Sequence, residues 1–69
     1  MDMDEFMEKV NNFLKNGFLV EVKTFDKKYI ISKYIAYNNF VDLYFGEDLN
    51  FLGSVNYSDI VNIRKVRLK

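Results

Sequence analysis

The chain contains neither cysteine nor histidine, and this limits the ways in which a domain of its size can be stabilised. With 69 residues it lies near the lower limit for a domain that folds alone. Disulfide bonds and the usual zinc sites are excluded, so stability has to come from the core and from association with other chains. Seven Phe and five Tyr supply large apolar side chains for such a core.

The N-terminal segment shows the apolar spacing of a helix. Asp2 followed by Glu5 resembles a capping box, and Gly17 is suited to the left-handed residue that commonly ends a helix. Residues 2–16 are therefore expected to form a helix that lies across the mouth of a sheet. The apolar stripe of this helix consists of Phe6, Met7, Val10, Phe13 and Leu14.

Beyond Gly17 the apolar period changes to two, which is typical of half-buried strands. Short polar turns separate five such segments, at residues 18–25, 29–37, 40–45, 49–56 and 60–68. The second segment is apolar on both sides, so we expect it to bend and to serve two sheets. The fold class that follows is mainly β with one N-terminal helix. Residues 1–69 form a single domain, in which residues 18–68 make a small five-stranded antiparallel, partly open barrel of the SH3-like type.

Residues 38–43, Asn-Asn-Phe-Val-Asp-Leu, resemble the first motif of the Sm-like family, which includes the bacterial host-factor RNA chaperones. Residues 60–63 resemble the apolar alternation of that family's last strand. The resemblance implies an SH3-like/Sm-like barrel, single-stranded RNA binding, and a ring in which the fourth and fifth strands of neighbouring subunits pair. Two departures from the family pattern stand out. Ser32 occupies the place of a glycine in the bent strand, and residues 56–59 lack the basic residue of the second motif.

Single-stranded nucleic-acid sites combine exposed aromatic side chains, on which bases stack, with cations for the phosphates. In the Sm-like family the aromatic residue of the first motif stacks on a base, and this position corresponds to Phe40. Two alternatives remain open: Phe40 is a core residue, and the two Asn residues are only a turn signal. Lys33 is a further candidate for phosphate contact. The candidate nucleic-acid-binding residues are Tyr37, Asn38, Asn39, Phe40, Asp42, Tyr57 and Arg64.

Enzyme chemistry has little support in the sequence. Without His or Cys, the Ser-His and Cys-His nucleophile arrangements are excluded. Glu47 and Asp48 lie in an expected turn, where acidic residues are usually just solvated. The three glycines are isolated, so no phosphate-binding glycine loop is present. We therefore expect no enzyme, no cofactor, no metal site and no small-molecule substrate.

Charge and hydropathy restrict the partners. Ten basic and ten acidic residues give a formal net charge of zero, which argues against a dedicated duplex-DNA binder. No apolar run approaches the ~20 residues that span a bilayer, and the acidic start is wrong for a signal peptide. The expectation is a cytoplasmic protein without a membrane partner.

Two functions from different classes remain. The first is a small non-enzymatic binding module of the Sm-like type that binds single-stranded RNA. The alternative is an SH3-like protein–protein interaction module, or a small regulatory or inhibitor protein, with no nucleic-acid binding. Self-association is expected in either case, because it would bury apolar surface that so small a domain leaves exposed.

Overall fold

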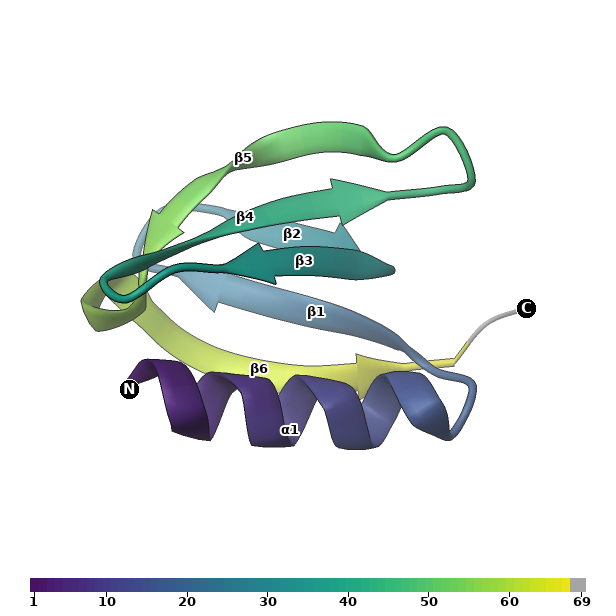
Figure 1. Cartoon of the computed structure of the whole chain (residues 1–69), viewed down its shortest axis with the longest axis horizontal. Helices are drawn as coiled ribbons and strands as arrows, with labels where there is room; N and C mark the ends of the chain where they lie inside the picture. Colours follow the sequence, from purple (N-terminus) through teal and green to yellow (C-terminus); the bar gives the residue numbers. More distant parts are fainter. Residues whose placement is uncertain (68–69) are drawn as a thin grey trace.

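The computed structural model describes residues 1–67 and shows one α-helix, one short 3-10 helix and six strands around a shared core (Figure 1). The helix α1 spans Met3–Lys15. The three-residue helix η1 spans Tyr57–Asp59. The strands are β1 (Leu19–Thr24), β2 (Lys28–Ile31), β3 (Lys33–Ala36), β4 (Phe40–Phe45), β5 (Asn50–Asn56) and β6 (Ile60–Val66). The last strand was expected to reach Leu68, which lies outside the described residues.

The predicted helix is confirmed, including its cap. The Asp2 side chain accepts a hydrogen bond of 2.8 Å from the backbone N–H of Glu5, as the capping pattern predicts. Phe6 and Val10 are fully buried in the core, so the apolar stripe faces the strands. Gly17 adopts a φ of 86° just after the helix, a conformation that glycine accepts without steric cost. Figure 1 shows α1 running beside β1 and β6.

The strands form two antiparallel sheets of three strands each, ordered β2-β1-β6 and β3-β4-β5. The prediction of a mainly β fold with one N-terminal helix is confirmed. The prediction of five strands is wrong, because the segment expected at residues 29–37 is divided into β2 and β3. The described strands also do not close into a barrel: β5 and β6 are joined by η1 but lie at the edges of different sheets.

Ser32 marks the corner between the two sheets. Its backbone N–H donates to the carbonyl oxygen of Tyr44 at 3.0 Å, and its Oγ accepts a hydrogen bond of 3.0 Å from the N–H of Gly46. The expected bend is therefore present without a glycine. The serine hydroxyl holds the corner against the end of β4.

The core lies between the two sheets and α1. Phe6 has its ring centroid 5.3 Å from that of Tyr34, edge-on, and 5.6 Å from that of Tyr57. Both distances fall in the range in which aromatic pairs attract each other. The buried hydrophobic residues are Phe6, Val10, Val20, Val22, Ile31, Val41, Leu43, Val55, Tyr57, Ile60 and Ile63. Within the described residues, no helix has the length and the apolar character needed to cross a membrane.

A bulge lies in the pairing of β4 with β5. Leu43 pairs with Gly53 and Tyr44 with Phe51, so Leu52 is the extra residue. Gly53 follows the extra residue and faces Tyr29 on β2 of the other sheet. A Cβ at this position would lie 3.5 Å from the ring of Tyr29.

Candidate interaction site

The turn predicted at Asn38 and Asn39 joins β3 to β4 and brings two aromatic rings together. The backbone N–H of Tyr37 donates to the carbonyl oxygen of Phe40 at 2.8 Å and closes the turn. The rings of Tyr37 and Phe40 are stacked, with centroids 4.7 Å apart and planes inclined by 18°. Both side chains are substantially exposed, at 43% and 38%. Phe40 is therefore a surface residue and not a core residue.

Tyr57 holds this turn from the side of the core. It is buried, with its ring against Phe6, and its hydroxyl donates a 2.7 Å hydrogen bond to the carbonyl oxygen of Tyr37. Its backbone N–H donates to the carbonyl oxygen of Asn39 at 3.3 Å. Burial raises the pKa of the Tyr57 phenol above its ordinary value. The ring that was a candidate for base stacking thus lies in the core, and its role is to fix the turn.

Arg64 lies on the other sheet and is already paired. Its Nε and Nη2 atoms donate to the two carboxylate oxygens of Glu21 at 3.0 and 3.1 Å, which is the bidentate arrangement. The hydrogen bond from Arg64 lowers the pKa of the Glu21 carboxyl, and the same bond raises the pKa of Arg64. The structure does not bring Arg64 together with the Tyr37–Phe40 pair.

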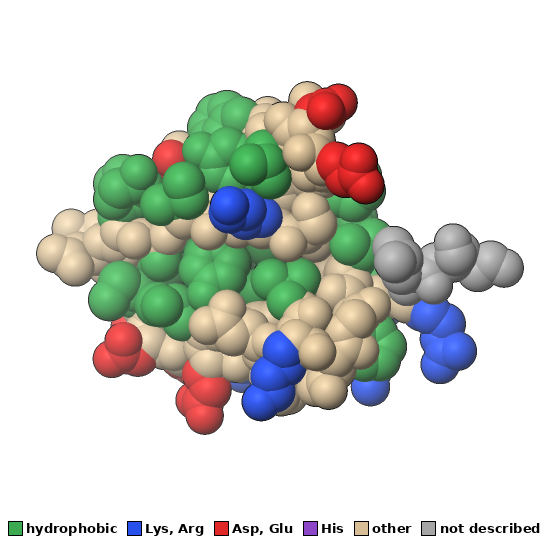
Figure 2. All heavy atoms as spheres, turned by 45° about the vertical axis from the view of Figure 1, so that its right-hand side comes forward, with side chains coloured by type: hydrophobic (Ala, Val, Ile, Leu, Met, Phe, Trp, Pro, Cys, Tyr) green, Lys and Arg blue, Asp and Glu red, His purple; other side chains and the backbone are tan. Residues whose placement is uncertain are grey.

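The outer face of the sheet β3-β4-β5 carries an apolar surface, which we call the aromatic face. It consists of Ile35, Tyr37, Phe40, Tyr44 and Phe51. The strand register assigns them to one side. Phe40, Asp42 and Tyr44 are two residues apart along β4 and therefore share a face. Tyr44 pairs with Phe51 on β5, Ile35 on β3 pairs with Asp42, and Tyr37 stacks on Phe40. The centroids of Tyr44 and Phe51 are 5.6 Å apart. Figure 2 shows hydrophobic side chains gathered over the upper half of the molecule, where Figure 1 places this sheet.

Two charged residues accompany the aromatic face. Asp42 lies half-buried at its centre on β4, and its Oδ1 accepts a hydrogen bond from the hydroxyl of Ser54 on β5. Lys33 is exposed on β3, directly opposite Tyr44. Among residues 1–67, neither Lys33 nor Asp42 belongs to an ion pair. Of the predicted site residues, the structure thus places Tyr37, Phe40 and Asp42 on one face, with the turn Asn38–Asn39 at its end.

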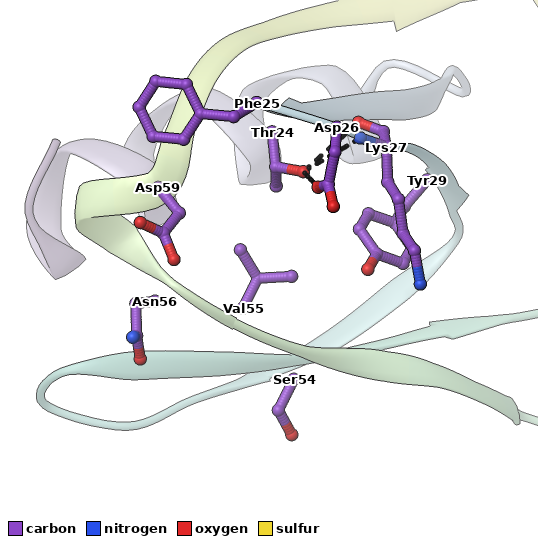
Figure 3. Close-up of a pocket in the computed structure, with 9 residues that line it drawn as sticks. All are labelled: Thr24, Phe25, Asp26, Lys27, Tyr29, Ser54, Val55, Asn56 and Asp59. Atoms are coloured by element: carbon purple, nitrogen blue, oxygen red, sulfur yellow. Dashed lines mark hydrogen bonds between the residues drawn. The ribbon is translucent and has the colours of Figure 1, made fainter.

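A separate hollow of 520 Å³ lies between the turn that follows β1 and the end of β5 (Figure 3). Hydrogen bonds hold that turn: Thr24 Oγ1 donates to Asp26 at 3.3 Å and accepts from the N–H of Lys27 at 3.2 Å. Phe25, 75% exposed, stands at the rim. The hollow is open to solvent and contains none of the predicted site residues. Its lining consists of Thr24, Phe25, Asp26, Lys27, Tyr29, Ser54, Val55, Asn56 and Asp59.

Sequence reasoning missed Ile35, Tyr44 and Phe51 as members of the site. A signal was present for β4, because Phe40, Asp42 and Tyr44 alternate with the buried Val41 and Leu43. No such signal existed for Phe51, because the extra residue in β5 sets which of its side chains reach the outer face.

The part of the chain that the structure describes contains no group of three His, Cys, Asp or Glu residues that could hold a metal ion. Comparisons of the chain with known protein families, with curated proteins and with solved structures found no match.

Proposed function

We propose that this chain is a non-enzymatic protein-interaction module and that the aromatic face is its binding surface. The observation that carries the proposal is a group of five large apolar side chains on one side of a single sheet, four of them exposed and Tyr44 half-buried. Scattered exposed apolar residues need no explanation, but a contiguous group on one face is typical of interaction sites. Tyr and Phe are also enriched at the centres of protein interfaces.

The distribution of charge favours a protein partner over a nucleic acid. Glu21 and Lys23 alternate along β1 with the buried Val20 and Val22, so their side chains lie on the outer face of the other sheet. Arg64 is on that face as well, bound to Glu21. On the aromatic face Lys33 is accompanied by the carboxylate of Asp42. A nucleic-acid site needs cations beside its stacking residues, and this surface has one carboxylate for its one lysine.

Single-stranded RNA binding is the second candidate, and one observation favours it. The stacked rings of Tyr37 and Phe40 are exposed beside two Asn side chains, as the Sm-like resemblance implies. In that case an Sm-like assembly would be built through the strand edges, with β5 of one copy beside β6 of the next. A labelled single-stranded RNA distinguishes the two candidates. Binding that weakens steeply with salt and is lost in Phe40→Ala would favour RNA.

A photoreactive phenylalanine analogue placed at position 51 tests the proposal in the cells to which the protein is native. The matched control carries the analogue at Val61, which is 48% exposed on β6 of the other sheet. We expect cross-linked protein from position 51 and much less from position 61. Cross-linking of position 51 to RNA, equal yields at both positions, or no product at position 51 would contradict the proposed function.

A further inference from the structure

Resting on the proposed function, we infer that the partner of the aromatic face is a second copy of this chain. The two copies form a face-to-face dimer with two-fold symmetry and reciprocal ion pairs between Lys33 and Asp42. The inference starts from the strand register at the centre of the face.

Four side chains form a rectangular block across β3 and β4. Lys33 pairs with Tyr44, and Ile35 pairs with Asp42, so the two charged residues occupy opposite corners of the block. All four lie on the same side of the sheet, because directly paired residues share a face and residues two apart along a strand do so too. The two apolar residues, Ile35 and Tyr44, occupy the remaining corners.

This arrangement is self-complementary under a two-fold rotation. A two-fold axis in the plane of the interface, crossing the line from Lys33 to Asp42 at its midpoint and at a right angle, exchanges these two corners and runs close to Ile35 and Tyr44. It brings Lys33 of each copy over Asp42 of the other, and both ion pairs form at once. The same axis sets Ile35 and Tyr44 against their own copies. The one cation and the one carboxylate of the block are therefore both paired, with apolar contacts between them.

Burial of this face requires a cation near Asp42. The carboxylate accepts a hydrogen bond from Ser54, and within residues 1–67 it has no ion-pair partner. Covering it with an apolar surface would leave a buried charge without a counterion, which is costly. A second copy supplies the cation through Lys33. The proposed partner therefore neutralises the carboxylate of Asp42 and also covers Tyr44 and Phe51.

The test is the mass of the full chain in solution, measured over a range of concentrations by sedimentation equilibrium. We expect a dimer for the wild type. Lys33→Asp and Asp42→Lys each place like charges opposite one another, and each should weaken dimerisation by ~10-fold or more. The double variant restores both ion pairs with reversed polarity and should recover affinity to within about threefold of the wild type.

Two exposed charges on α1 provide matched controls, because Lys9→Asp and Glu8→Lys make the same charge changes away from the face. Both should dimerise like the wild type. Circular dichroism of every variant checks that the fold is kept. A monomeric wild type, a double variant as weak as the single ones, or a larger closed ring would overturn the inference. A monomer that still cross-links from position 51 to a different protein would overturn the dimer and leave the proposed function standing.

Discussion

The hydroxyl of Tyr57 lies 2.7 Å from the backbone carbonyl oxygen of Tyr37 and donates a hydrogen bond to it. This bond joins the buried core to the turn that presents the stacked rings at the surface. The side chain at position 57 therefore acts on the aromatic face without being part of it. Its loss should change the stability of the fold and the order of the turn together.

Replacing Tyr57 with Phe removes this hydrogen bond and keeps the ring. We expect the free energy of unfolding to fall by ~1 kcal/mol, because the carbonyl of Tyr37 loses its partner. Urea denaturation measures the change. Tyr37→Phe is the control, since it removes a hydroxyl from an exposed ring and should cost less than half as much. Equal losses in the two variants would show that the bond contributes nothing.

The tyrosines predict a loss of stability at alkaline pH. Burial raises the pKa of Tyr34 and of Tyr57 above the ordinary value of 10.0. The unfolded chain has the ordinary pKa of 10.0, and below that pH the two un-ionised phenols contribute their full stabilisation to the fold. This stabilisation is lost as pH rises from there through the raised values of the folded state. Absorbance of the phenolate ions should show late titration of two tyrosines, accompanied by unfolding. In the variant with Phe at both positions, thermal stability should decline less above about pH 10.

Truncation of Phe40 and of Phe6 to Ala should lower the free energy of unfolding by very different amounts. Phe40 is 38% exposed and stacks on Tyr37, so Phe40→Ala should lower the free energy of unfolding by only about 1–2 kcal/mol. Phe6 is fully buried, and Phe6→Ala should cost ~3–5 kcal/mol. Chemical denaturation of both variants measures the contrast. If the two losses were the same, Phe40 would have to pack in the core.

The ion pair between Glu21 and Arg64 predicts sensitivity to acid. The hydrogen bond from Arg64 lowers the pKa of Glu21 below its ordinary value of 4.5. The stabilisation is present above that ordinary value and is lost as pH falls through the lowered pKa of the folded state. The midpoint of thermal unfolding should therefore drop between about pH 5 and pH 2, and Glu21→Gln should show a smaller drop. The control Glu8→Gln alters an exposed carboxyl on α1, and its curve should follow that of the wild type.

The backbone of Leu49 has a left-handed conformation, so a substitution at this position should stabilise the protein. Leu49 has a φ of 53° in the turn between β4 and β5, where its N–H donates to the carbonyl oxygen of Gly46 at 3.0 Å. The left-handed conformation costs a non-glycine residue ~1–2 kcal/mol. Leu49→Gly relieves this strain and should raise the free energy of unfolding by up to ~1 kcal/mol, as thermal denaturation can show. Asp48→Gly in the same turn should not raise the free energy of unfolding. A rise of similar size there would show that strain at Leu49 is not the cause.

The helix and most strands could be predicted because their signals are local. The spacing of Phe6 and Val10 and the cap at Asp2 depend only on nearby residues. The division of the long strand at Ser32 could not be located, because it rests on hydrogen bonds to Tyr44 and Gly46, which are distant in sequence. Whether the sheets close into a barrel depends likewise on the relative placement of β5 and β6.

The candidate site was predictable only in part, for a related reason. Tyr37 and Phe40 flank a recognisable turn, so their proximity follows from the sequence. Tyr57 also lies next to a turn, but η1 directs its ring into the core. Phe51 reaches the aromatic face through the bulge at Leu52, and a shift of one residue in that pairing would direct it to the other side.

The corner at Ser32 has a consequence for how this protein opens. β2 and β3 are two halves of one continuous stretch of backbone, and each half belongs to a different sheet. Separation of β2 from β1 would loosen the serine whose two hydrogen bonds hold the end of β4, so we expect the two sheets to open together. Amide protons of β1 and β4 should then exchange with solvent through the same global event, with one common free energy of opening.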